Sequence, residues 1–154
     1  FADLAELRWM IVEQVHVVER GRTAHAGGGL EFHPDIDAAM NAARPDVVLL
    51  SAVLQYLERP WLVLDAMVGH GIEFILIDRL SCSIGTPALT TQVMPGSLYA
   101  ASYPSWLFDC MSLIERLSPH YVLLDRFAGT DPPITGIGLK AEFNGFLFRR
   151  RSPV

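Results

Sequence analysis

The sequence has few charged residues and no long hydrophobic run. Charged residues make up 19% of the 154 residues and hydrophobic residues 51%, whereas typical soluble domains are about 25% charged. The longest central stretch without a charge or a proline is the 11-residue segment 47–57, and a membrane-spanning helix needs about 20 residues. This composition excludes a transmembrane helix and intrinsic disorder. Together with a mean hydropathy of +0.29, it favours strands buried on both faces, as in parallel sheets.

Basic charge is also scarce. The chain has 12 Lys and Arg against 17 Asp and Glu, a formal net charge of −5. A nucleic-acid-binding domain usually carries a basic patch, and the one local excess is the Arg149–Arg151 triplet, which is typical of a solvated tail. We therefore predict no nucleic-acid partner and no membrane partner.

Cysteine and histidine show no ligand spacing. Cys82 and Cys110 form no CxxC pair, and the five histidines lie in no HxxxH or HxH pattern. This pattern indicates neither a disulfide framework nor a metal site, so we expect both cysteines to be packing residues. No secretory leader opens the sequence, and we predict a cytoplasmic location.

The common nucleotide-binding and hydrolase motifs are missing as well. No GxGxxG, Walker A or GxSxG string occurs, which argues against a dehydrogenase, an NTPase and a serine hydrolase. Gly27–Gly29 follows a predicted helix and precedes a predicted strand, whereas a phosphate-binding turn follows a strand and opens a helix. We therefore expect a helix C-cap and turn at these glycines.

Strand and helix patterns alternate along the rest of the chain. The pattern predicts one domain, 1–154, of α/β class, with a mostly parallel sheet covered by helices on both faces. The last two strands lack a helix between them and predict an antiparallel hairpin at a sheet edge. The predicted strands are 9–12, 30–33, 47–50, 74–77, 121–127 and 141–148; the predicted helices are 14–25, 36–43, 60–68 and 105–117; and 80–103 is predicted to be a loop.

Ligands of open α/β sheets bind beyond the carboxyl ends of the strands, so the residues that follow each strand are the candidates for a site. Glu13 suits a carboxylate that accepts hydrogen bonds from ribose hydroxyls, and capping of the next helix is the alternative. The other candidates of this kind are Gln14, His33, Pro34, Asp35, Ser51, Gln55, Tyr56, Asp78 and Arg79.

A second group of candidates lies in the segment 95–106. Tyr99 and Tyr103 are predicted to line a pocket or to form a lid over one, because aromatic rings give rigid contact area and hydroxyls give orientation. The alternative for Tyr103 is anchoring of the following helix, and core packing is favoured for Trp106.

Five segments carry a family resemblance: 9–14, 30–35, 45–57, 74–79 and 99–108. In these segments the chain resembles a family of bacterial class I S-adenosylmethionine-dependent methyltransferases that are often associated with surface-polysaccharide gene clusters, most specifically in the Tyr99–Trp106 string. The resemblance implies a Rossmann-like class I methyltransferase sheet. The family's first strand and Gly-rich loop would precede Phe1, so we expect the sequence to be N-terminally incomplete.

By position, the resemblance implies roles for the candidates. Those near the cofactor are Glu13 and Gln14 at the ribose, Asp35 and Ile36 at the adenine, and Ser51, Ala52 and Gln55 near the methionine part; those facing the acceptor are Asp78, Arg79, Tyr99, Ser102 and Tyr103.

The expected function is methyl transfer to an oxygen or nitrogen of a small molecule or sugar. Tyr103 and His33 are the candidates for a general base. The first alternative is a non-catalytic, methyltransferase-like interaction module, for which a homodimer is one arrangement. The second is a nucleotide-sugar-binding enzyme, which would require a diphosphate loop that the sequence lacks.

Overall fold

A computed structural model describes residues 6–25, 29–94, 96–97, 100–136 and 138–152. The chain divides into two compact units, Phe1–Pro45 and Asp46–Val154, which we call the N-terminal and C-terminal units. The predicted glycine turn lies largely outside the described residues, as does Tyr99.

The N-terminal unit is built on two parallel strands. In β1 (Trp9–Val12) and β2 (Leu30–His33), Trp9 lies opposite Leu30 and Val12 opposite His33. Two helices follow these strands in the chain: α1 (Val15–Ala24) and α2 (Ile36–Ala42). Two residues separate each strand from the helix that follows it.

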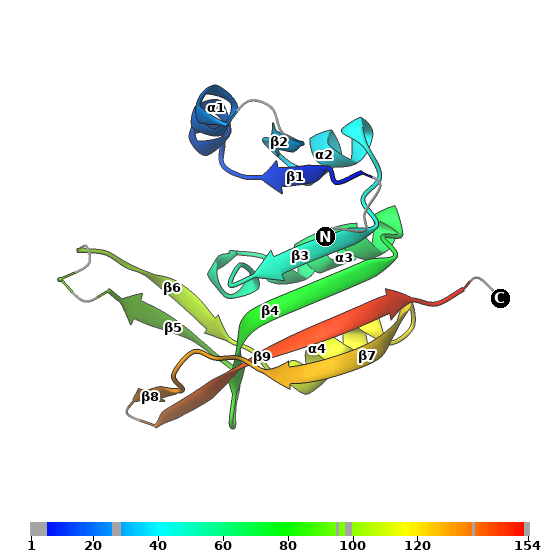
Figure 1. The fold of residues 1–154 in the computed structure, drawn as a ribbon. Coiled ribbons are helices and arrows are strands. Elements are labelled where there is room, and N and C mark those ends of the chain that lie inside the picture. Colours follow the sequence, from blue (N-terminus) through cyan, green and yellow to red (C-terminus); the bar gives the residue numbers. More distant parts are fainter. Residues whose placement is uncertain (1–5, 26–28, 95, 98–99, 137, 153–154) are drawn as a thin grey trace. The chain divides into compact units, whose positions relative to one another are not determined.

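The C-terminal unit contains a mixed sheet in the order β3-β4-β9-β7 (Figure 1). Its elements are β3 (Val47–Ser51), the 3-10 turn η1 (Leu54–Tyr56), α3 (Pro60–His70), β4 (Phe74–Ser83), β5 (Ala88–Val93), β6 (Ser102–Leu107), α4 (Cys110–Leu117), β7 (Tyr121–Ala128), β8 (Ile134–Gly136) and β9 (Leu139–Arg150). As the sequence predicts, α3 starts at a proline, and it ends at Gly71, which has the left-handed φ of 64° that favours glycine.

The prediction of a mostly parallel, Rossmann-like sheet is wrong. Among the described residues two strand pairs are parallel, β1–β2 and β3–β4, and four are antiparallel. The long strand β9 inserts antiparallel between β4 and β7, so the C-terminal antiparallel pair that the sequence predicts lies partly inside the sheet. The molecule is α/β, with small sheets that are mixed, antiparallel or only two strands wide.

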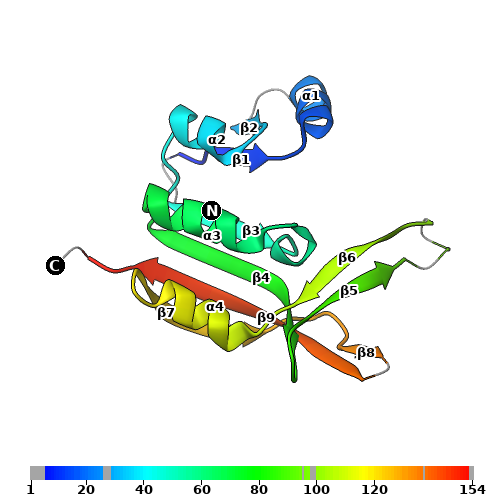
Figure 2. The same cartoon turned by 180° about the vertical axis from the view of Figure 1, so that it is seen from behind.

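Within the C-terminal unit, the described helices α3 and α4 both lie on one face of the mixed sheet, whereas the sequence predicts helices on both faces (Figure 2). Figure 2 shows α3 and α4 on the same side of β4 and β9. The core under these helices contains side chains that are at most 1% exposed: Leu64, Ile75, Ile77, Leu113, Leu117, Phe146 and Phe148. By contrast, Val47 and Leu49 on β3 are 51% and 43% exposed, which shows why an apolar strand alone does not predict burial on both faces.

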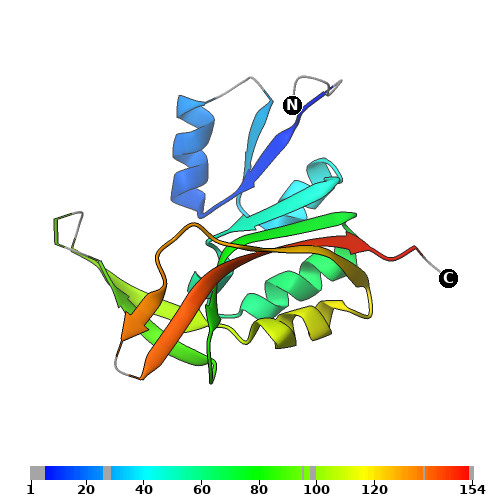
Figure 3. The same ribbon diagram turned by 60° about the horizontal axis from the view of Figure 1, so that its bottom comes forward.

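The segment predicted to be a loop at 80–103 contains regular structure. β4 continues to Ser83, and β5 and β6 pair antiparallel with Gln92 opposite Tyr103. We call this hairpin the arm; it extends away from the mixed sheet (Figure 3). The arm displaces the start of the predicted helix 105–117 to Cys110. Burial along β5 alternates residue by residue, as in a strand covered on one face, but the prolines and glycines that flank the arm, at 85, 87, 95 and 96, favoured the prediction of a loop.

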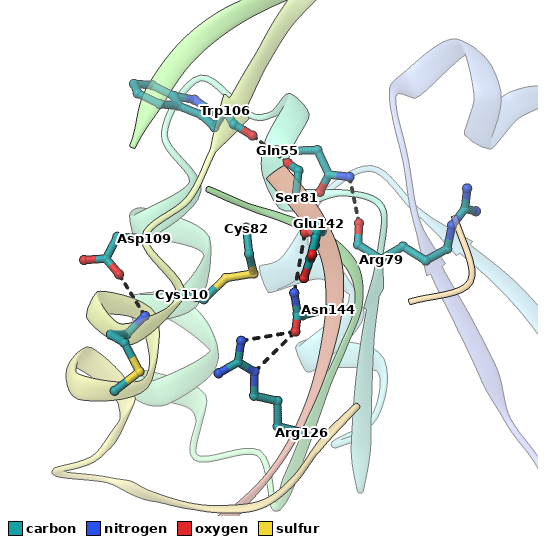
Figure 4. Close-up of a disulfide and its surroundings, with 11 residues drawn as sticks. Gln55, Arg79, Ser81, Cys82, Trp106, Asp109, Cys110, Arg126, Glu142 and Asn144 are labelled. Atoms are coloured by element: carbon teal, nitrogen blue, oxygen red, sulfur yellow. Dashed lines mark hydrogen bonds between the residues drawn. A yellow bond between two sulfur atoms is a disulfide. The ribbon is translucent and has the colours of Figure 1, made fainter. Parts of the chain in front are cut away.

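The two cysteines are joined, which corrects the expectation of unpaired packing residues. Cys82 of β4 and Cys110 of α4 form a disulfide with a Cα–Cα distance of 5.6 Å (Figure 4). Both are buried, at 5% and 6% exposure. None of the described helices is long and apolar enough to cross a membrane.

Candidate functional site

In the N-terminal unit, the predicted ribose- and adenine-binding residues lie at the carboxyl ends of β1 and β2. Glu13 follows Val12, and its backbone N–H donates to the carbonyl of His33 at 3.1 Å. The Glu13 carboxylate accepts a hydrogen bond from the Gln14 N–H at 3.1 Å. Asp35 caps α2, because its carboxylate accepts from the Ala38 N–H at 2.7 Å, and Ile36 is the first residue of that helix. The structure thus brings these four candidates to one edge.

His33, one of the two candidates for a general base, faces the Glu31 side chain of its own strand. Its Nε2 is buried, accepts no hydrogen bond among the described residues, and lies 3.6 Å from the Glu31 carboxylate. The Glu31 carboxylate also accepts two hydrogen bonds from the Arg8 guanidinium, at 2.9 and 2.7 Å. These bonds lower the pKa of Glu31. His33 therefore lies beside the Arg8–Glu31 ion pair.

In the C-terminal unit, the polar residues gather where β3 and β4 end. Ser51 lies opposite Asp78 in the parallel ladder, and the Ser51 hydroxyl donates to the Asp78 carboxylate at 3.2 Å. The Ala52 N–H donates to the Asp78 carbonyl at 2.9 Å. Together with Gln55, Tyr56, Arg79 and Asp131, these residues form what we call the strand-end site.

The backbone at this place is irregular on both strands. Ala52 and Arg79 have φ values of 50° and 54°, in the left-handed region that side chains other than glycine rarely adopt. The pairing of β4 with β9 also shifts register between Ile77 and Leu80, which places Asp78 and Arg79 in a β-bulge. Bulges re-aim side chains and are frequent beside functional sites, so the bulge supports a role for these two residues.

Gln55 links the two strand ends. It is 1% exposed, and its side-chain Nε2 donates to the Arg79 carbonyl at 3.0 Å (Figure 4). Its Oε1 is buried and accepts no hydrogen bond within the described part of the chain. A carbonyl can only accept a hydrogen bond, so the NH2 group of the Gln55 amide faces the Arg79 carbonyl and Oε1 points the other way. Gln55 therefore offers a buried acceptor to a bound group or water.

Arg79 extends from the bulge to the segment after β7. Its Nε and Nη2 each donate to the Asp131 carboxylate at 2.8 Å, a bidentate geometry that gives strong charge-assisted hydrogen bonds. The pair lowers the pKa of Asp131 and raises that of Arg79. Asp131 was not predicted from the sequence, because it lies 52 residues from Arg79 in a Gly- and Pro-rich connection.

A pair of tyrosines joins η1 to the arm. The rings of Tyr56 and Tyr103 meet edge to face, with centroids 5.3 Å apart. The Tyr56 hydroxyl donates to Gln92 Oε1 at 3.0 Å, and the Tyr103 hydroxyl donates to the Met94 sulfur at 3.0 Å. The structure thus brings two sequence candidates together, Tyr56 from the strand-end group and Tyr103 from the segment 95–106.

The remaining predicted residues of the arm have simpler positions. Ser102 is exposed at the start of β6. The Trp106 indole N–H donates to the Leu57 carbonyl at 3.0 Å, so this ring fastens the arm to the segment after η1. Among the described residues no group of three or more His, Cys, Asp or Glu side chains is arranged to hold a metal ion.

The Arg79–Asp131 pair predicts a pH-dependent contribution to stability. A carboxyl whose pKa is lower in the folded state stabilises the fold above its unfolded pKa of about 3.9 and loses that effect as pH falls through its folded value. We expect Asp131→Asn to lower the free energy of unfolding by less than about 1 kcal/mol at pH 7, since both side chains are partly exposed. The difference from the wild type should shrink below about pH 4.

Thermal unfolding from pH 2.5 to 7 measures this effect, with the exposed Asp125→Asn as the matched control. A difference between wild type and Asp131→Asn that stays constant down to the lowest pH would contradict the assigned ion pair.

Comparison of the chain with models of protein families, with curated proteins and with solved structures finds no match.

Proposed function

We propose that the protein transfers a methyl group from S-adenosylmethionine to an oxygen or nitrogen of a small molecule or sugar. The observation that supports this proposal is the placement of polar side chains beyond the carboxyl ends of both parallel strand pairs. Glu13 and Asp35 follow β1 and β2, and Ser51 and Asp78 end the paired part of β3 and β4. The resemblance of the sequence to class I methyltransferases motivates the choice of cofactor. The resembled family is often associated with surface-polysaccharide gene clusters, and this association motivates the choice of acceptor.

The residues of the N-terminal unit suit a nucleoside. One oxygen of the exposed Glu13 carboxylate bonds the Gln14 N–H, which leaves the other to accept from a ribose hydroxyl. Asp35 uses one oxygen for its helix cap and keeps the second for an amino group. Ile36 would supply apolar contact. Two carboxylate acceptors and one apolar contact suit the nucleoside part of the cofactor.

In the C-terminal unit, Asp78, Arg79 and Tyr103 would hold the acceptor. The buried, unpaired Oε1 of Gln55 can accept a hydrogen bond from a donor group of the bound molecule. When bound, S-adenosylmethionine supplies an electrophilic methyl group. The protein's own contribution is alignment, which can provide much of the rate in a displacement of this kind, together with a carboxylate at Asp78 that can receive the acceptor's proton.

A location in the cytoplasm belongs to this proposal because the methyl donor is made there. The disulfide between Cys82 and Cys110 argues against that location, because disulfides in cytoplasmic proteins are uncommon.

Calorimetric titration of the full chain with S-adenosylmethionine tests the proposal. We expect a Kd in the micromolar range and a loss of about tenfold in affinity, or about 1.4 kcal/mol, for Glu13→Ala. Glu19→Ala, an exposed glutamate on α1, is the matched control and should bind as the wild type does. No heat at millimolar donor would overturn the proposal.

One observation favours a second candidate, an interaction module without catalysis. Among the described residues β3 pairs with β4 alone, and Val47 and Leu49 are exposed on it. An uncovered apolar strand with a free edge is a surface for association, a second copy of the chain included. This candidate gains support if the donor titration shows no binding while sedimentation shows a dimer.

A further inference from the structure

We infer that the acceptor side of the strand-end site takes an uncharged ring with several free hydroxyl groups, such as a sugar without phosphate or carboxylate substituents. This inference rests on the proposed function for the presence of an acceptor, and it adds the chemical class of that acceptor. Three features of the site support it: its charge, its unused hydrogen-bonding atoms and its aromatic wall.

The charge of the site disfavours anionic acceptors. Asp78 and Asp131 contribute two carboxylates and Arg79 one guanidinium, and the Arg79 charge is already paired with Asp131 through two hydrogen bonds. The arm adds nothing positive, because residues 80–108 contain no Asp, Glu, Lys, Arg or His. A phosphate or carboxylate placed here would meet the Asp78 carboxylate, and none of the described residues that form the strand-end site offers an unpaired cation to balance it.

The unused polar atoms suit hydroxyl groups. One oxygen of Asp78 accepts from Ser51, and the other accepts no side-chain hydrogen bond from the part of the chain that the structure describes. Arg79 likewise uses Nε and Nη2 for Asp131 and keeps Nη1 for a further acceptor. A hydroxyl both donates and accepts, so two neighbouring hydroxyls of one ring can satisfy a carboxylate and a guanidinium at once.

The aromatic wall suits the apolar side of such a ring. Tyr56 is 41% exposed and is held by its contact with Tyr103 and its hydrogen bond to Gln92. Tyr56 follows Gln55, whose side-chain amide donates to the Arg79 carbonyl at 3.0 Å, so its ring belongs to the same strand-end site as Asp78 and Arg79. A tyrosine face gives large, rigid contact area with a polar tip, and a sugar ring offers C–H groups on one face and hydroxyls at its edge.

Saturation-transfer NMR on the full chain tests the inference with defined probes. The neutral probes are methyl α-D-glucopyranoside, methyl α-D-mannopyranoside and methyl β-D-galactopyranoside; the anionic probe is glucose 6-phosphate, and the aromatic probe is phenol. We expect ring-proton signals for at least one neutral glycoside, with affinity about tenfold or more above that of the sugar phosphate. Tyr56→Ala and Asp78→Asn should each lower that affinity about tenfold.

Leu89→Ala is the matched control, because Leu89 is 56% exposed on the arm and lies outside the site. Tighter binding of the sugar phosphate or of phenol overturns the inference, as does the absence of signal for all three glycosides. Donor titration separates the two proposals. If the donor binds and no glycoside does, the acceptor class is wrong; if a glycoside binds and the donor does not, the methyl-transfer proposal is wrong and the ligand class stands.

Discussion

The double variant Cys82→Ala/Cys110→Ala is expected to have a free energy of unfolding about 3 to 4 kcal/mol below that of the oxidised wild type. The disulfide joins residues 28 positions apart, and the ring that it closes contains the whole arm. Closing a ring of this size restricts the unfolded chain, and the chain-entropy model gives an effect of that order. Because typical domains are stable by only about 5–15 kcal/mol, the loss is a large fraction of the total.

The folded state itself should change little in this variant. The Phe108 N–H donates to the Ser81 carbonyl and the Ser83 N–H to the Phe108 carbonyl, both at 2.8 Å, so the main chain already holds β4 beside the segment that leads into α4. The Ser81 hydroxyl adds a bond to the Trp106 carbonyl at 2.6 Å (Figure 4). We therefore expect the arm to keep its position. The slope of the denaturation curve should increase, because the unfolded chain without the disulfide exposes more surface.

Urea unfolding followed by circular dichroism measures the difference. Wild type that has been unfolded, reduced and refolded under reductant is the control, and its stability should agree with that of the double variant to within the small effect of the alanine side chains. Equal stability of oxidised and reduced wild type would show that the disulfide contributes nothing to the fold.

The parallel strand pairs were the most predictable part of the fold. The apolar runs 47–50 and 74–77 are confirmed as strands, and the structure pairs them in parallel. A proline at the start and a glycine at the end mark α3 between them. Local signals of this kind depend on a few adjacent residues. The order of the strands depends on contacts far apart in sequence, and neither the position of β9 between β4 and β7 nor the antiparallel arm follows from any local pattern.

The candidate site was predictable only as a set of strand ends. That rule located Ser51 and Asp78, which the structure brings to hydrogen-bonding distance. It could not identify Asp131, whose place depends on how the segment after β7 folds back to Arg79. It also missed the bulge at Asp78 and Arg79, since a bulge shows itself only in the register of two paired strands.

The disulfide was missed for a related reason. Cysteine spacing is informative where local motifs such as CxxC occur, and Cys82 and Cys110 approach each other only because the arm returns the chain to β4. Predicting the arm as a loop therefore removed the evidence for the bond as well.

Phe146→Ala is expected to lower the free energy of unfolding by about 3 to 5 kcal/mol. Phe146 lies on β9 at the centre of the mixed sheet, opposite Ile77 on one side and Arg126 on the other, and its side chain is fully buried. Its ring stacks with that of Phe148 at 6.2 Å between centroids. Truncation removes apolar contact area and leaves a cavity that neighbouring strands, fixed by their ladders, cannot close.

The size of this effect depends on β9 being an interior strand, so the variant also tests the strand order that replaces the predicted parallel sheet. Phe127→Ala is the matched control: Phe127 lies on the edge strand β7 and is 36% exposed, and its truncation should cost less than half as much. Chemical denaturation of both variants measures the two losses. Equal losses would mean that β9 is no more buried than β7, which would contradict the order β3-β4-β9-β7 on which the geometry of the strand-end site depends.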